Sequence, residues 1–93
     1  LELVALHTPG HTEGSTSFHL PREGIVFTGD LLFKGTIGRV DLPGGDARAM
    51  ERSLARVAAL PPATVVYPGH GAPTSIGAEL PWLHGFGFPD AAR

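Results

Sequence analysis

Three short segments of this 93-residue chain carry side chains that bind metal ions, and in each segment glycine stands beside the candidate ligand. The candidates are His11, Asp30 and His70. Neutral imidazole is a nitrogen ligand and a carboxylate supplies oxygen, so together they would suit a zinc- or iron-type site. Because a carboxylate has two oxygens, Asp30 could bridge two divalent ions about 3.5–4 Å apart, an arrangement used to activate water for hydrolysis. The ligands are far apart in the sequence, so only the fold can bring them together.

Apolar runs close to these ligands predict strands, and each ligand follows the end of one strand within a few residues. We expect four strands, at residues 1–6, 15–20, 25–28 and 64–67. The first reads as buried on both faces, and the turn composition of residues 21–24 predicts that the second and third strands pair antiparallel. A loop after a strand can hold a ligand rigidly while exposing it, and an adjacent glycine allows close approach of the backbone.

One main helix is predicted over residues 47–60, with Asp46 as its N-cap. The apolar side chains at helical spacing form one face, and they are Met50, Leu54, Val57 and Ala58. Three arginines on the other side indicate a solvated face. Residues 34–45 are predicted to be a long glycine-rich loop. A short second helix is expected after Thr74 or Ser75, with Pro81 interrupting it.

Composition limits the class of protein. The length allows one small domain, which we place at residues 1–84, with an irregular tail at 85–93. Seven Lys+Arg against nine Asp+Glu give a formal charge of −2, which offers no electrostatic case for nucleic acid. The chain has no cysteine, so disulfides and thiolate sites are excluded. No apolar run approaches the roughly 18 residues of a membrane span, so we expect no membrane partner and a cytoplasmic location.

These motifs resemble those of the metallo-β-lactamase fold superfamily, in its glyoxalase II-like branch. Residues 7–15 resemble the third metal motif of that family, residues 28–46 the fourth and residues 67–79 the fifth. The resemblance implies an α/β (α+β) fold, the C-terminal half of a four-layer αββα sandwich. In that half a mixed or antiparallel sheet packs against the helix at 47–60.

The resemblance also implies roles for single residues. His11 would be a ligand of one metal ion, Asp30 would bridge both ions, and His70 would be a ligand of the second. Zinc is the expected cofactor, with iron or manganese as alternatives. The implied reaction is hydrolysis of an acyl-glutathione-type thioester by a metal-bridging hydroxide. Arg39 stands where the family has a basic residue facing the carboxylate of the thiol carrier, and His7 is expected to support the site rather than bind metal.

The family's main ligand cluster, His-x-His-x-Asp-His, does not occur in these 93 residues. Each ion would therefore keep two protein ligands, whereas zinc requires three or four. We predict that the chain alone, interpreted as a fragment, binds metal weakly and has no hydrolase activity. We also expect an exposed sheet face, covered by the missing N-terminal half, by a partner chain or by a homodimer.

Two further functions are compatible with the same residues. A persulfide dioxygenase-like iron oxidoreductase shares the Gly-Arg-x-Asp element at residues 38–41; its iron would be held by His11 and Asp30 but not by His70. Alternatively, the chain is a non-catalytic half-domain that serves as an interaction module. In that case the three candidate ligands would be turn-shaping polar residues in a fold that has lost its site.

Overall fold

The computed structural model describes residues 2–41 and 43–83 as one mixed sheet, one hairpin and two helices. The sheet has the strand order β1-β2-β3-β6-β7. Its strands are β1 Val4–His7, β2 Thr16–Leu20, β3 Ile25–Gly29, β6 Val65–Pro68 and β7 Thr74–Ser75. The hairpin consists of β4 Leu32–Phe33 and β5 Thr36–Ile37, and the helices are α1 Ala47–Ala58 and α2 Ile76–Leu83. The predicted tail at 85–93 lies outside the described residues, and the boundary at residue 84 stays a prediction.

Strand pairing brings the ends of β3 and β6 together. β2 and β3 pair antiparallel, with Leu20 opposite Ile25, which confirms the predicted arrangement. β3 and β6 pair parallel, with Phe27 opposite Tyr67. Because their carboxyl ends meet at one edge of the sheet, the residues that follow them, including Asp30, become neighbours.

Helix α1 begins where the sequence predicts. The side chain of Asp46 accepts hydrogen bonds from the backbone N–H groups of Arg48 at 2.9 Å and Ala49 at 3.1 Å. It thus satisfies two of the donors that a helix N-terminus leaves without partners. The helix ends at Ala58, two residues short of the predicted end.

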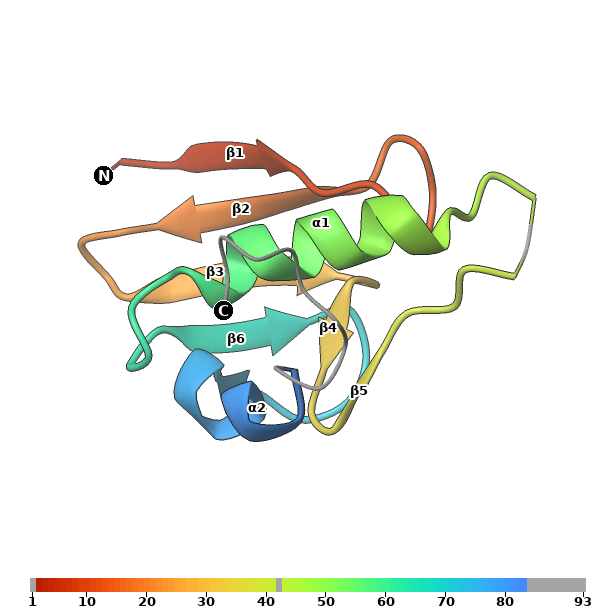
Figure 1. Ribbon diagram of the computed structural model, residues 1–93. Coiled ribbons are helices and arrows are strands. Elements are labelled where there is room, and N and C mark those ends of the chain that lie inside the picture. Colours follow the sequence, from red (N-terminus) through yellow and green to blue (C-terminus); the bar gives the residue numbers. More distant parts are fainter. Residues whose placement is uncertain (1, 42, 84–93) are drawn as a thin grey trace.

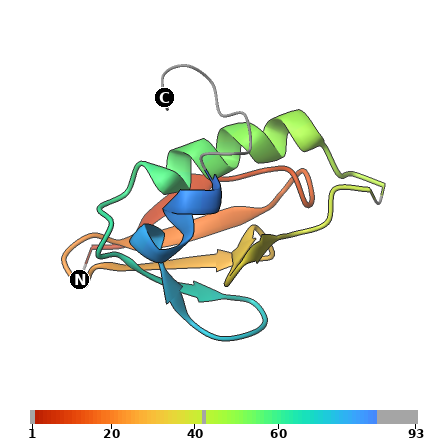
Figure 2. The same cartoon turned by 60° about the horizontal axis from the view of Figure 1, so that its bottom comes forward.

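The two helices lie on one face of the sheet, so the described part of the chain has two layers (Figures 1 and 2). The core lies between these layers, and the fully buried side chains come from both: Val26, Leu31, Leu32, Met50, Leu54, Val57, Val66, Ile76 and Leu83. Burying each such side chain contributes about 1.5–3 kcal/mol, so this interface is the main source of stability.

Neither helix covers the opposite face of the sheet (Figure 2). Phe18, Phe27 and Tyr67 lie side by side across β2, β3 and β6 on that face, and each is 40–44% exposed. The rings of Phe27 and Tyr67 stack with centroids 5.6 Å apart. On the preceding segment Leu3 is 57% exposed, so the prediction that the first strand is buried on both faces is wrong for this chain. The sheet does have a second apolar face, opposite the helices, but the described residues do not cover it.

Two other local predictions are also wrong. The predicted loop at 34–45 contains β5, which pairs with β4 through a turn at Lys34-Gly35. Gly35 has φ +82°, a conformation that glycine adopts without strain. Pro81 lies inside α2 and does not interrupt it, although the predicted cap is present, since the Ser75 hydroxyl accepts from the Ala78 N–H at 3.1 Å. In so short a helix, proline removes only the bond to the carbonyl of Gly77.

Candidate metal centre

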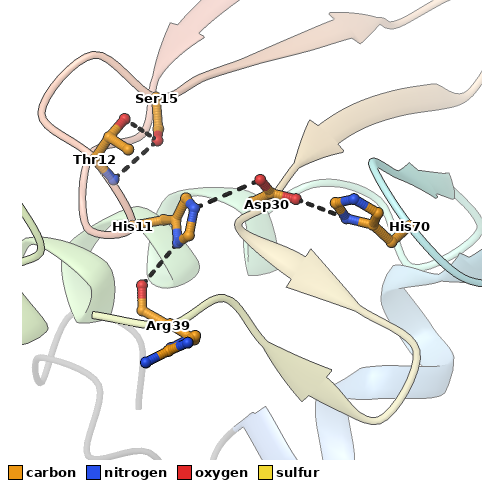
Figure 3. A network of polar contacts seen from close by, with 6 residues as sticks. All are labelled: His11, Thr12, Ser15, Asp30, Arg39 and His70. Carbon is orange, nitrogen blue, oxygen red and sulfur yellow. Dashed lines mark hydrogen bonds and ion pairs between the residues drawn. The ribbon is translucent and has the colours of Figure 1, made fainter. Parts of the chain in front are cut away.

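The three predicted ligands lie in one row, with the carboxylate in the middle (Figure 3). The Nε2 atom of His11 is 3.5 Å from one carboxylate oxygen of Asp30. The Nδ1 atom of His70 is 3.0 Å from the other oxygen. Both oxygens of Asp30 are therefore directed at imidazole nitrogens from separate segments, which is the arrangement expected of a carboxylate between two ion positions.

Helix α1 holds the loop that carries His11. The Ser53 hydroxyl donates to the carbonyl of Pro9 at 2.6 Å, and the N–H of Asp46 donates to the carbonyl of Gly10 at 2.8 Å. Gly10 has φ +146°, and a Cβ there would lie 2.6 Å from the Cα of Met50. Only glycine fits this approach of loop to helix, so the glycine before His11 is required by packing.

The ring of His11 is oriented by a backbone carbonyl. Its Nδ1 atom lies 2.8 Å from the carbonyl oxygen of Arg39. A carbonyl oxygen only accepts, so Nδ1 carries the hydrogen and, in the neutral ring, Nε2 keeps its lone pair on the side of Asp30. This hydrogen bond fixes the tautomer and the direction of the His11 imidazole, as a backbone or carboxylate partner does for a metal-binding histidine.

Asp30 is held by a sharp turn at the end of β3 and by close backbone packing. Gly29 has φ +56°, which ends the strand. A Cβ on Gly38 would lie 1.7 Å from the carbonyl oxygen of Asp30, so the backbone just after β5 packs directly against this residue. A Cβ on Gly69 would lie 3.1 Å from a carboxylate oxygen of Asp30. Two glycines distant in the sequence thus make room for Asp30, Gly38 for its backbone carbonyl and Gly69 for its carboxylate.

His70 is the most exposed of the three ligands. Its side chain is 80% exposed, against 24% for His11 and 37% for Asp30. The ring lies 6.1 Å from the ring of Phe33, centroid to centroid. Behind it, the N–H of Gly69 donates to the carbonyl of Gly29 at 2.8 Å, which joins the residues just before His70 and Asp30.

The donor set fits a zinc or iron ion in kind but not in number. Two imidazoles and one carboxylate give each ion position two protein ligands. Within residues 2–41 and 43–83, no three His, Cys, Asp or Glu side chains are grouped closely enough to hold an ion. His11, Asp30 and His70 are therefore a predicted partial site.

Two hollows, each of about 280 Å³, flank Asp30. One lies against the ends of β2 and β3, and its lining includes Ser15 and Thr28. The other is mainly apolar, and its lining includes Phe33 and Ile37. The residues of β4 and β5 were not predicted as site residues, because residues 34–45 were predicted to be a loop. The Lys34-Gly35 dipeptide between two apolar pairs was the signal for a hairpin.

Arg39 lines the apolar hollow, as the prediction of a substrate contact requires. Its guanidinium pairs with both oxygens of Asp41, at 3.0 and 2.9 Å. The hydrogen bond and the charge of Asp41 raise the pKa of Arg39, and the hydrogen bond from Arg39 lowers the pKa of Asp41. His7 lies elsewhere: its Nε2 atom is 2.7 Å from the carbonyl of Glu13, and its ring lines a separate hollow with Arg52.

Comparison with known proteins places the chain in a family. Residues 1–70 match the Metallo-beta-lactamase superfamily. An uncharacterized protein of Mycobacterium leprae is 50% identical over 84 residues, covering 85% of this chain and 38% of that protein. The probable metallo-hydrolase YqgX of Bacillus subtilis is 41% identical, covering 90% and 42%. Hydroxyacylglutathione hydrolase GloC of Haemophilus influenzae is 41% identical, covering 80% and 35%.

Solved structures give the same result. TTHA1623 in a di-iron-bound form is 50% identical with a TM-score of 0.82, covering 84% of this chain and 39% of that one. ETHE1 from Myxococcus xanthus is 44% identical with a TM-score of 0.77, covering 83% and 36%. The BLEG-1 B3 metallo-beta-lactamase is 42% identical with a TM-score of 0.83, covering 87% and 41%.

The described residues form a mixed sheet with two helices on one face, and the three candidate ligands lie after its strands. The chain belongs to the metallo-β-lactamase superfamily, a family of metal-dependent hydrolases, which confirms the predicted superfamily and fold class, while the glyoxalase II-like branch stays a prediction. It spans about two fifths of the length of the relatives that it matches. Neither α1 nor α2, the helices of the described ranges, has the length and apolar character needed to cross a bilayer.

Proposed function

We propose that the chain supplies one side of a two-metal hydrolase site that cleaves thioesters of the acyl-glutathione type. The observation that carries this proposal is the position of Asp30, whose two oxygens face His11 at 3.5 Å and His70 at 3.0 Å. A carboxylate between two imidazoles is suited to bridging two ions. The remaining ligands would come from a segment outside these 93 residues.

The metal ions, zinc in the first instance and iron or manganese as alternatives, would supply Lewis acidity at the scissile carbonyl. The residues of this chain would hold the ions and orient the ligand atoms. Asp30 would contribute one oxygen to each ion position. His11 would present Nε2 because the carbonyl of Arg39 occupies its Nδ1–H. His70, on the exposed side, would complete the second position.

The apolar hollow beside Asp30 supports a thioester substrate. Phe33 and Ile37 give it apolar walls that suit an acyl or thiol chain. Arg39 at the same hollow offers a cation for a carboxylate of the thiol carrier, held in place by Asp41. The similarity to a hydroxyacylglutathione hydrolase supports the same substrate class.

A second candidate is a persulfide dioxygenase-like iron oxidoreductase. The similarity to ETHE1, at 44% identity, favours it, as does the Gly-Arg-x-Asp element at residues 38–41. In this alternative His11 and Asp30 would hold a single iron, and His70 would be dispensable for metal binding. Metal content and oxygen consumption of the purified gene product separate the two activities.

We further propose that the sheet face opposite the helices is an internal interface with the rest of such a domain. Three cross-strand aromatic residues, Phe18, Phe27 and Tyr67, make this face apolar. The relatives are more than twice as long as the matched region, so they contain chain that is available to cover it. A homodimer or a separate partner chain are the other outcomes, which sedimentation of the gene product distinguishes. A module that only docks would show this association without metal-dependent turnover.

The central test is Asp30→Asn in the gene product that contains this chain. We expect loss of bound metal, measured by elemental analysis, and loss of thioester hydrolysis by about 100-fold or more. Glu23→Gln, in the exposed turn between β2 and β3, is the matched carboxylate control and should leave both quantities unchanged. Full metal content and near-wild-type turnover in Asp30→Asn would refute the bridging role.

A further inference from the structure

We propose that Glu79 is a positioning residue that ties together two walls of the apolar hollow beside Asp30. It fixes the distance between Phe33 and His70, and so sets the size of the acyl or thiol chain that the hollow admits. The claim about substrate size rests on the proposed function. The claim that Glu79 fixes the distance between the two rings is independent of it.

Glu79 accepts hydrogen bonds from three elements although it is only 4% exposed. One carboxylate oxygen accepts from the N–H of Gly35 at 2.8 Å and from the indole N–H of Trp82 at 2.6 Å. The other oxygen accepts from the hydroxyl of Thr74. The carboxylate therefore joins the β4–β5 turn, β7 and α2 at one buried point.

Two of these donors are connected along the chain to residues that line the hollow. Gly35 is in the turn of the hairpin whose residues Phe33 and Ile37 line it. Thr74 begins β7, directly after the loop that carries His70. The two walls meet at the front, where the rings of Phe33 and His70 lie 6.1 Å apart. Glu79 connects the same two walls on the buried side, through Gly35 and Thr74.

A carboxylate is well suited to a positioning role. Its burial removes hydration, a cost that its hydrogen bonds must offset. What a carboxylate offers in return is two oxygens in fixed geometry, able to accept from several donors at once. Two of the donors that reach Glu79 adjoin the walls, and the third, the indole of Trp82, belongs to the helix that carries Glu79.

The test compares Glu79→Ala with Glu79→Gln, which keeps an oxygen acceptor, and with Leu83→Ala. Leu83 is fully buried in the same helix, so its truncation destabilises α2 without removing the link between the walls. Thr74→Val, which removes one of the three bonds, provides a milder variant should Glu79→Ala fail to fold.

The first readout is nuclear Overhauser contact between the Phe33 and His70 rings in the 93-residue chain. It should weaken in Glu79→Ala and Thr74→Val and persist in Glu79→Gln and Leu83→Ala. The second is the KM for a series of thioesters of increasing acyl length, measured on the gene product. Glu79→Ala should flatten the difference between short and long chains by about tenfold, with kcat less affected.

An unchanged ring contact and an unchanged KM series in Glu79→Ala would overturn the positioning role. An equal change in Leu83→Ala would do the same, because it would show a general effect of stability. If the gene product hydrolyses no thioester, the proposed function fails. The ring contact in the 93-residue chain then still decides whether Glu79 positions the two walls.

Discussion

Adding a single methyl group at Gly38 tests how tightly the residue after β5 packs against the backbone of Asp30. The Cβ of Gly38→Ala would lie 1.7 Å from the carbonyl oxygen of Asp30, 2.9 Å from its carbonyl carbon and 3.5 Å from the Cβ of His11. Contacts below 3.0 Å essentially never occur for real Cβ atoms. The backbone of Asp30 or of the hairpin must therefore move by more than an ångström.

Such a displacement is a case of overpacking against backbone, which cannot rotate away as a side chain can. We expect Gly38→Ala to lower the free energy of unfolding by about 1–3 kcal/mol or more. Urea unfolding of the 93-residue chain measures this loss, and with a slope of about 1–3 kcal/mol per molar the midpoint falls by roughly 1 M. Gly14→Ala is the matched control, because a Cβ there meets nothing within 4 Å, and its change should stay within about 0.5 kcal/mol.

The same shift should disturb the metal ligands, since Asp30 and His11 are the residues that the new methyl group meets. In the gene product, we expect Gly38→Ala to lose metal affinity while Gly14→Ala retains it. Unfolding midpoints of the two variants that agree within error would refute the close packing. A destabilised Gly38→Ala that keeps wild-type metal affinity would show instead that the strain is relieved away from Asp30.

Three further predictions concern the cap, the buried acid and the open sheet face. Asp46→Ala should cost about 1 kcal/mol in urea unfolding, because it removes the acceptor of two N-terminal amides of α1, whereas Asp46→Asn should recover most of the loss. Burial alone would raise the pKa of Glu79, but hydrogen bonds from Thr74, Gly35 and Trp82 outweigh it and the pKa lies below its usual value of 4.5. Its contribution to stability is therefore present above pH 4.5 and lost as the pH falls through the lowered pKa, so the stability difference between wild type and Glu79→Gln should shrink on acidification. Phe27→Ser should reduce self-association of the isolated chain, measured by sedimentation velocity, and an unchanged association constant would contradict an adhesive aromatic face.

The sequence predicted elements whose determinants are local. Helix α1 follows from its cap at Asp46 and its apolar stripe, and the β2–β3 hairpin follows from two apolar runs around a turn. The β4–β5 hairpin was missed because two-residue strands have almost no periodicity and lie in a glycine-rich segment. The open sheet face was expected from the missing His-x-His-x-Asp-His segment, but what covers it could not be read from the sequence, because an apolar residue such as Phe27 shows that a surface needs cover and not which chain provides it.

In the candidate site, too, local features were predictable from the sequence and tertiary contacts were not. Glycine beside each ligand predicted a role for all three positions, but the reasons differ and depend on tertiary contacts. Gly10 is required by packing on Met50, whereas Gly69 allows a close approach to Asp30, where a Cβ would lie 3.1 Å from a carboxylate oxygen. The distances between His11, Asp30 and His70 depend on the pairing of β3 with β6 and on the contact of a loop with α1, which no single segment encodes.

The hydrogen bond from the N–H of Gly69 to the carbonyl of Gly29 treats the two halves of the site unequally. It joins the residues that immediately precede Asp30 and His70, so the spacing of these two anchors is built from main chain alone. His11 instead depends on a loop tethered to α1 by one hydroxyl and one amide. Substitutions in α1 can therefore move His11, whereas the spacing of Asp30 and His70 is set by the sheet and does not depend on α1.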